Sequence, residues 1–185
     1  MAKKLKIKSN YFLLLAAFLG IASVVLSILM PTVVYTLGDS MTASYQGLGM
    51  IFGGNVNLVT VTDKLIGEGT VTSNSIYEGV TFNITLFVSV LLILVSSIIL
   101  GLSNYVKVLN SKLFKLLGSA MLLGGAILIF FTTQSSGLSI NAGDVETYNA
   151  TLKIGSYSLG IGAIAAAVSG IVGSGLAISS IVFEK

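Results

Sequence analysis

The sequence has no cysteine, no histidine, no arginine and no tryptophan, and it has a single proline. Without cysteine the chain cannot form a disulfide or present a thiolate to a metal ion or a substrate. Without histidine it lacks the commonest general base and transition-metal ligand of proteins. These absences exclude disulfide-stabilised scaffolds, zinc–thiolate and iron–sulfur sites, and imidazole-based catalysis. We therefore expect a protein that is not an enzyme and has no cofactor and no metal site.

Charged side chains are also scarce. They make up 9% of the 185 residues, whereas 54% of the residues are hydrophobic. An ordinary globular domain has roughly 25% charged residues, because a soluble protein needs them to cover its surface. The composition therefore indicates an integral membrane protein. The net charge of +3 is small and no nucleic-acid-binding motif accompanies it, so we expect no nucleic-acid partner.

Four apolar stretches are each long enough to cross a bilayer, which takes ~20 residues of α-helix. They cover residues 11–37, 80–102, 113–131 and 159–183. None contains Asp or Glu, and we expect Lys107, Lys112 and Lys115 to lie between or beside the second and third spans, not within them. The first stretch is longer than the apolar region of a signal peptide and no small-residue cleavage site follows it, so we expect an uncleaved span. The prediction is a single all-α membrane domain over residues 1–185, a bundle of four transmembrane helices in contact with membrane lipid.

The lysines predict which side of the membrane each segment faces. Most of them lie in residues 1–10, in the short connection 103–112 and at the C-terminus, whereas nearly all acidic residues lie in 38–79 and 132–158. The positive-inside rule then places both termini and the connection in the cytoplasm, and the two long loops outside the plasma membrane. The lysines assigned to the inner side are Lys3, Lys4, Lys6, Lys8, Lys107, Lys112, Lys115 and Lys185.

The two outer loops are longer than simple connections need to be. Residues 56–62 read V-N-L-V-T-V-T, which is rich in β-branched side chains, and a Gly-Glu-Gly turn at 67–69 precedes a second strand-like stretch from 70–72. This pattern predicts a β-hairpin, and residues 150–154 of the second loop could add a further strand. Because two strands alone are marginal in water, we expect a small extracytoplasmic antiparallel sheet of three or more strands.

An apolar, glycine-rich segment precedes the predicted hairpin. Residues 45–54 read Y-Q-G-L-G-M-I-F-G-G, an unusual composition for a solvated loop. Two interpretations are open: an element that contacts lipid or a partner protein, or a plug packed over the helix ends. The candidate contact residues are Tyr45, Gly47, Phe52 and Gly53.

Small residues repeat along the fourth stretch, and small residues let transmembrane helices approach closely. They predict helix packing, either inside the four-helix bundle or against another copy or another membrane protein. The first stripe consists of Gly162, Ala166, Gly170 and Ser174, and a second stripe beside it consists of Ala165, Ser169, Gly173 and Ala177.

Acidic residues of the outer loops offer a weaker alternative. Asp39, Asp144 and Glu146 have the oxygen ligands that hard divalent cations prefer. Solvated acidic side chains in loops are far commoner than metal ligands, so the prediction stays that no metal binds.

The order of these parts resembles the claudin-type tetraspan fold, with four spans, both termini inside, a large strand-bearing first outer loop and a shorter second one. Claudins carry a Gly-Leu-Trp signature and a cysteine pair in the first outer loop. Here Gly49 follows Gly47 and Leu48, and the chain has neither Trp nor Cys. Claudin barrier or pore residues therefore do not transfer to this sequence.

A second resemblance is to small tetraspan membrane proteins of low-GC Gram-positive bacteria and their wall-less relatives. These often show a Tyr-x-Gly…Phe-Gly pattern after the first span, which Tyr45, Gly47, Phe52 and Gly53 match. They also have a last span rich in Gly, Ala and Ser, as in residues 160–174. This resemblance implies a tetraspan fold and no particular activity.

A structural or accessory role, through helix packing and outer-loop contacts within a homo-oligomer or with a membrane-protein partner, accounts for these features best. A channel or transporter is an alternative, but ionisable side chains inside spans, which usually mark transport pathways, are not expected here. A lipid-binding protein with a groove between its spans is the other alternative.

Overall fold

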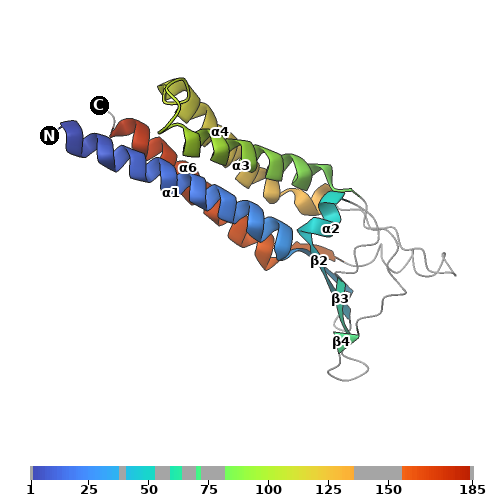
Figure 1. The fold of residues 1–185 in the computed structure, drawn as a ribbon. Coiled ribbons are helices and arrows are strands. Elements are labelled where there is room, and N and C mark those ends of the chain that lie inside the picture. Colours follow the sequence, from blue (N-terminus) through green and yellow to red (C-terminus); the bar gives the residue numbers. More distant parts are fainter. Residues whose placement is uncertain are drawn as a thin grey trace. The chain divides into compact units, whose positions relative to one another are not determined.

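The computed structural model describes residues 2–37, 41–52, 59–63, 70–71, 82–135 and 156–183. The chain divides into two compact units. Figure 1 shows its helices and strands. The helical unit comprises Met1–Leu26, Val88–Ile129 and Ala165–Lys185, and the sheet unit comprises Ser27–Phe87 and Phe130–Ile164. In chain order the elements are α1 (Ala2–Leu29), β1 (Pro31–Leu37), β2 (Met41–Gln46), α2 (Gly47–Phe52), β3 (Val59–Asp63), β4 (Thr70–Val71), α3 (Ile84–Leu102), α4 (Lys112–Ile129), the 3₁₀ turn η1 (Thr132–Ser135), β5 (Ser156–Leu159) and α6 (Ile161–Val182).

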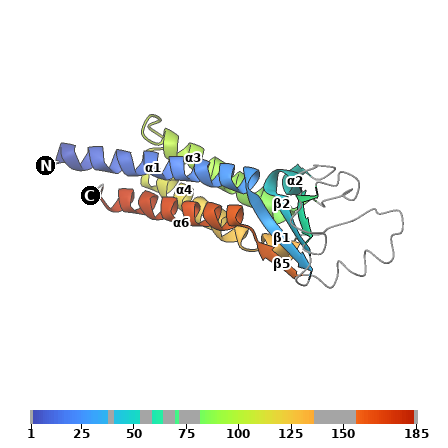
Figure 2. The ribbon, with the colours of Figure 1, turned by 90° about the horizontal axis from the view of Figure 1, so that it is seen from below.

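In the described part of the chain, four helices are long and apolar enough to cross a membrane, which confirms the predicted four spans. The spans are Tyr11–Leu29, Ile84–Leu102, Lys112–Ile129 and Ile161–Val182. Within the helical unit the four helices lie side by side (Figures 1 and 2). Their outward faces carry large apolar side chains such as those of Phe18, Leu94 and Ile171, which suit contact with lipid tails.

The first span ends earlier than predicted, and its predicted end at residue 37 is wrong. Helix α1 stops at Leu29, and Pro31–Leu37 forms strand β1. Pro31 cannot donate the hydrogen bond that would continue a helix, and it restricts the residue before it. The β-branched run that follows it favours a strand. The predicted stretch 11–37 therefore joined a helix and a strand of similar hydrophobicity.

The other spans differ from their predicted limits by a few residues. The stretch predicted at 80–102 is helical from Ile84, because Asn83 caps α3: its Oδ1 accepts a hydrogen bond from the Leu86 backbone N–H at 2.9 Å. The stretch predicted at 113–131 is α4, and the one predicted at 159–183 is α6, which begins after β5.

The strands form one antiparallel sheet in the order β4-β3-β2-β1-β5, so the predicted small sheet is confirmed. The hairpin predicted from residues 56–62 and 70–72 corresponds to β3 and β4, in which Val61 pairs with Val71. Strand β5 adds a strand from the second predicted outer loop, whereas residues 150–154 lie outside the described part of the chain.

The core of the sheet unit is built on strand β1, which lies between β2 and β5. Val33 pairs with Tyr45 of β2 on one side and with Leu159 of β5 on the other. Val33 and Tyr45 are buried. Cross-strand pairs of β-branched and aromatic side chains are the usual source of sheet stability. A backbone hydrogen bond adds to the pairing of β1 and β5, because the N–H of Gly160 donates to the Thr32 carbonyl at 2.8 Å.

Candidate functional site

The interface between α3 and α4 is built from serine hydroxyls on one helix and glycines on the other. The Oγ atoms of Ser89 and Ser96 donate hydrogen bonds to the backbone carbonyls of Gly125 and Gly118, both at 2.6 Å. A Cβ added at Gly125 would lie 2.6 Å from Cγ1 of Ile93 and 3.0 Å from the Ser89 carbonyl oxygen. Glycine is therefore what lets the two backbones come close enough for the hydroxyls to reach across.

Helix α6 contacts two neighbours in the helical unit through the predicted small-residue stripe. The Ser23 hydroxyl of α1 donates to the Ala166 carbonyl at 2.7 Å. The Ser174 hydroxyl donates to the Ser119 carbonyl of α4 at 3.0 Å. A Cβ added at Gly170 would lie 2.8 Å from the Cβ of Ala126 in α4. The stripe members Gly162, Ala166, Gly170 and Ser174 are all buried.

The second stripe is only partly buried. A Cβ at Gly173 would lie 3.1 Å from Leu122 and 3.2 Å from the Ala16 carbonyl oxygen, so this residue packs between α4 and α1. Ala177 is buried, whereas Ala165 and Ser169 are partly exposed. Of the two interpretations of these stripes, packing inside the bundle accounts for every member that has a described contact.

The ring of four helices closes between α1 and α3. A Cβ at Gly20 would collide with the Ser97 side chain, and a Cβ at Gly101 would lie 3.5 Å from the Cβ of Ala17. From the first pair to the second, the residue number falls in α1 and rises in α3, so the two helices are antiparallel. The Ser97 hydroxyl donates within its own helix, to the Ile93 carbonyl at 2.7 Å. The contacts described between α1 and α3 are therefore close packing of small residues.

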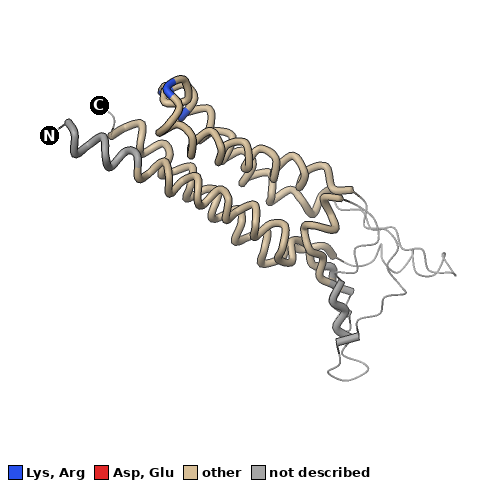
Figure 3. Tube along the Cα trace, viewed as in Figure 1, with Lys and Arg blue, Asp and Glu red and all other residues tan. Residues whose placement is uncertain are grey.

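Lys115 is the largest completely buried side chain in the described chain. It lies in the first turn of α4, on the helix face that also carries the buried residues Gly118, Ser119 and Leu122. Our prediction that Lys115 lies beside the third span and not within it is wrong, because the span Lys112–Ile129 includes this residue. A count of positive charges assigns each lysine to a loop, but a residue three positions after the start of a helix can face the interior. Figure 3 shows the basic residues at this end of α4 and in the loop before it.

The candidate contact residues before the predicted hairpin fall into two groups. Tyr45 is buried in β2. Gly47 begins α2, where an added Cβ would collide with the Ser27 carbonyl oxygen at the end of α1. The Thr32 hydroxyl donates to that same oxygen at 2.8 Å. Phe52 is exposed at the end of α2, and Gly53 lies outside the described residues.

Asn83 is a structural residue that the sequence analysis missed. Its side chain is completely buried; Nδ2 donates to the Thr132 carbonyl at 2.9 Å, and Oδ1 accepts from the Ser135 hydroxyl at 2.9 Å. Its backbone N–H donates to the Met50 carbonyl at 2.8 Å. Asn83 therefore joins α2, the start of α3 and η1. A polar amide directly before an apolar helical run was the signal that could have identified it as a helix cap.

In the described part of the chain, no group of three or more His, Cys, Asp or Glu side chains could hold a metal ion. The acidic residues considered as cation ligands, Asp39, Asp144 and Glu146, lie outside the described ranges. The arrangement that the structure does show is one of packing contacts: hydroxyl-to-carbonyl bonds, glycines at close approaches and a capping asparagine.

Comparisons with models of protein families, with curated proteins and with solved structures find no match. No family is therefore assigned. The chain is a four-span integral membrane protein with a small antiparallel sheet. Its four helices are long, apolar and packed together, and their outward faces contact lipid.

Proposed function

We propose that this chain is a structural or accessory protein of the plasma membrane, without enzymatic activity, that acts through its packed helices and through contacts made by its sheet unit. One observation carries the proposal. The buried hydroxyls of Ser23, Ser89 and Ser96 donate to backbone carbonyls of a neighbouring helix, as does that of Ser174. Polar groups that could serve a reaction are thus used to hold helices together.

The order of parts supports this role. Strands β1 to β4 lie between the first two spans, and β5 directly precedes the fourth. This agrees with the claudin-like layout, in which outer loops between rigid spans make the contacts. The resemblance concerns layout, because the claudin tryptophan and cysteines are absent.

The proposed orientation has both termini in the cytoplasm and the sheet outside. Phe12, near the start of the first span, stacks on Phe183, just after the fourth, with ring centroids 5.7 Å apart. This contact supports a topology in which both ends of the chain leave the membrane on the same side, and the lysine-rich segments favour the cytoplasm as that side.

Single-cysteine variants test this orientation cleanly, because the chain has no cysteine of its own. We expect Ser73→Cys to react with an impermeant maleimide on intact cells. Ser9→Cys and Ser111→Cys should react only after the membrane is permeabilised. Labelling of Ser9→Cys or Ser111→Cys from outside would reverse the proposed topology.

The accessory role is tested by purifying the tagged protein in native nanodiscs and measuring its mass by native mass spectrometry. A defined homo-oligomer, or a second protein present in a fixed ratio, is the expected result. A monomer that carries only lipid would contradict the accessory role and favour a lipid-binding protein.

A channel or transporter is the second candidate, and buried Lys115 is the observation that favours it. An ionisable side chain inside a membrane domain is costly and often marks a transport pathway. Ion flux into proteoliposomes separates the two candidates. The structural role predicts no flux above that of empty liposomes, for the native chain and for Lys115→Met. Flux in the native chain that Lys115→Met abolishes would establish the transport function instead.

A further inference from the structure

The short helix α2 is fixed next to the point where the chain enters the second span. Its Met50 carbonyl accepts the backbone N–H of Asn83 at 2.8 Å, and Asn83 is the residue directly before α3. Since α3 begins a membrane span at Ile84, its first turn lies at the edge of the hydrocarbon layer. Helix α2 therefore lies at the depth of the membrane surface.

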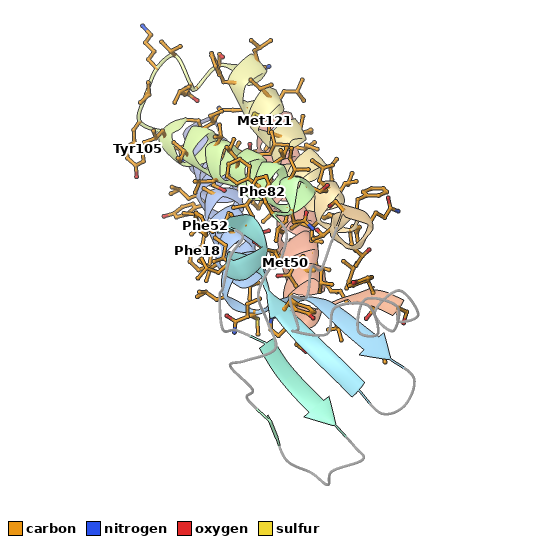
Figure 4. All side chains as sticks on the ribbon, turned by 90° about the vertical axis from the view of Figure 1, so that its right-hand side faces the viewer. Phe18, Met50, Phe52, Phe82, Tyr105 and Met121 are labelled. Carbon is orange, nitrogen blue, oxygen red and sulfur yellow. The ribbon has the colours of Figure 1, made fainter. Side chains whose placement is uncertain are left out.

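The side chains of α2 divide sharply between two environments. Met50 and Ile51 are buried in the sheet unit, whereas Phe52, the next residue, exposes 73% of its surface. Met50 and Phe52 lie on different sides of α2 (Figure 4). The helix sequence Gly47–Phe52 has no charged residue. An exposed phenylalanine on an uncharged helix is unfavourable in water and favourable in a lipid interface.

Other exposed phenylalanines of the sheet unit mark the same depth. Phe82 lies two residues before α3, and its ring centroid is 5.5 Å from that of Phe87 in the first turn of the helix. Phe130 and Phe131 follow the last residue of α4. All four are exposed. Aromatic side chains at the ends of spans typically anchor a protein at the membrane–water interface, and Phe52 extends this set to a residue outside the spans.

We propose that α2 is an interfacial anchor and that the Phe52 side chain inserts into the boundary between lipid headgroups and acyl chains. The partner of this surface is the bilayer itself. The proposal depends on the four-span membrane domain and not on the accessory role. A monomer in native mass spectrometry would therefore leave it intact, and its own test leaves the accessory role untouched.

Tryptophan fluorescence tests the proposal, because the chain has no tryptophan and Phe52→Trp provides a single reporter. The variant is reconstituted in phosphatidylcholine vesicles whose acyl chains carry bromine either near the headgroup or near the methyl end. We expect blue-shifted emission that is quenched most strongly by bromine near the headgroup and little by aqueous iodide.

Two matched variants calibrate the depth. Phe18→Trp replaces an exposed residue in the middle of the first span, and bromine deep in the acyl chains should quench it best. Tyr105→Trp replaces an exposed residue of the loop between α3 and α4, which should be more open to iodide. Phe52→Trp should fall between them in iodide accessibility.

Two results would overturn the proposal. Quenching of Phe52→Trp by iodide and not by brominated lipid would place the side chain in water. Quenching by neither would mean that protein covers it, as in a docking site for a second chain. If the tryptophan variant fails to fold, a nitroxide on Phe52→Cys answers the same question. We expect its relaxation to be more sensitive to oxygen than to a water-soluble nickel chelate, and the reverse order would refute insertion.

Discussion

The two compact units of this chain are stabilised in different ways. The helical unit repeats one kind of contact, a serine hydroxyl on a neighbouring backbone carbonyl, at Ser23, Ser89, Ser96 and Ser174. The sheet unit relies on a few crowded points, where Gly47 meets the end of α1 and where Asn83 joins three elements. When one of several weak bonds is lost, the others still hold the helices together. A clash at a single crowded contact has no such replacement. Substitutions should therefore be tolerated better in the helical unit.

The largest effect is expected for Gly47→Ala. The new Cβ would collide with the Ser27 carbonyl oxygen, a backbone atom that cannot rotate away. We expect a loss of about 3 kcal/mol in unfolding free energy, measured by thermal denaturation in mild detergent. Gly175→Ala in α6 is the control, because nothing lies within 4 Å of its added Cβ. It should leave stability unchanged or raise it by up to about 1 kcal/mol. Equal losses in the two variants would refute the crowded point at Gly47.

Asn83→Ala should follow, with a loss of about 2 kcal/mol in the same assay. It removes the cap of α3 and the bonds to Thr132 and Ser135, and it leaves the Thr132 carbonyl in a buried position without this donor. Asn83→Asp separates the two roles, because it keeps the acceptor for Leu86 and loses the donor to Thr132. An intermediate loss for this variant is expected. An unchanged unfolding free energy for Asn83→Ala would show that Asn83 does not hold α2, α3 and η1 together.

Gly125→Ala should destabilise the chain by about 1–2 kcal/mol, because Ile93 and the Ser89 carbonyl must move away from position 125 to admit a methyl group. Gly124→Ala is the matched control in the adjacent position, where the added Cβ meets nothing within 4 Å. The comparison isolates helix approach from the general effect of replacing glycine in a helix. A larger loss for Gly124→Ala would contradict the α3–α4 interface.

The smallest effect is expected for Ser89→Ala. Bonds of this kind between transmembrane helices average about 0.6 kcal/mol. The double variant Ser89→Ala/Ser96→Ala should lose about twice as much, because the two bonds lie two helical turns apart on the same interface. Steric trapping in bicelles resolves differences of this size. A single-variant loss as large as that of Gly47→Ala would remove the contrast between the two units.

The spans and the hairpin of β3 and β4 were predictable because their signals are local. Length and apolarity identify a span, and β-branched residues flanking a glycine turn identify a hairpin. Strand β1 was missed because Thr32, Val33 and Val34 continue the apolar run of the first span. Hydrophobicity does not separate a strand from a helix, and Pro31 was the better guide.

Which residues meet across the bundle was beyond prediction. Spacing showed that Gly170 and Ser174 share a face, but it could not show that this face meets Ala126 and Ser119 of α4. The burial of Lys115 was missed for a related reason. The positive-inside rule uses the charge of a lysine and ignores the direction in which the helix points it.

The hydroxyl-to-carbonyl contacts have a consequence for how such a fold can diverge. A backbone carbonyl is present in every residue, so each contact requires only a hydroxyl on one helix and a small residue on the other. At the acceptor positions Gly118, Gly125 and Ala166 the identity of the side chain matters less than its size. Two chains could therefore share this entire bundle and have few identical residues, and the spacing of donors and small residues would reveal their kinship better than overall identity.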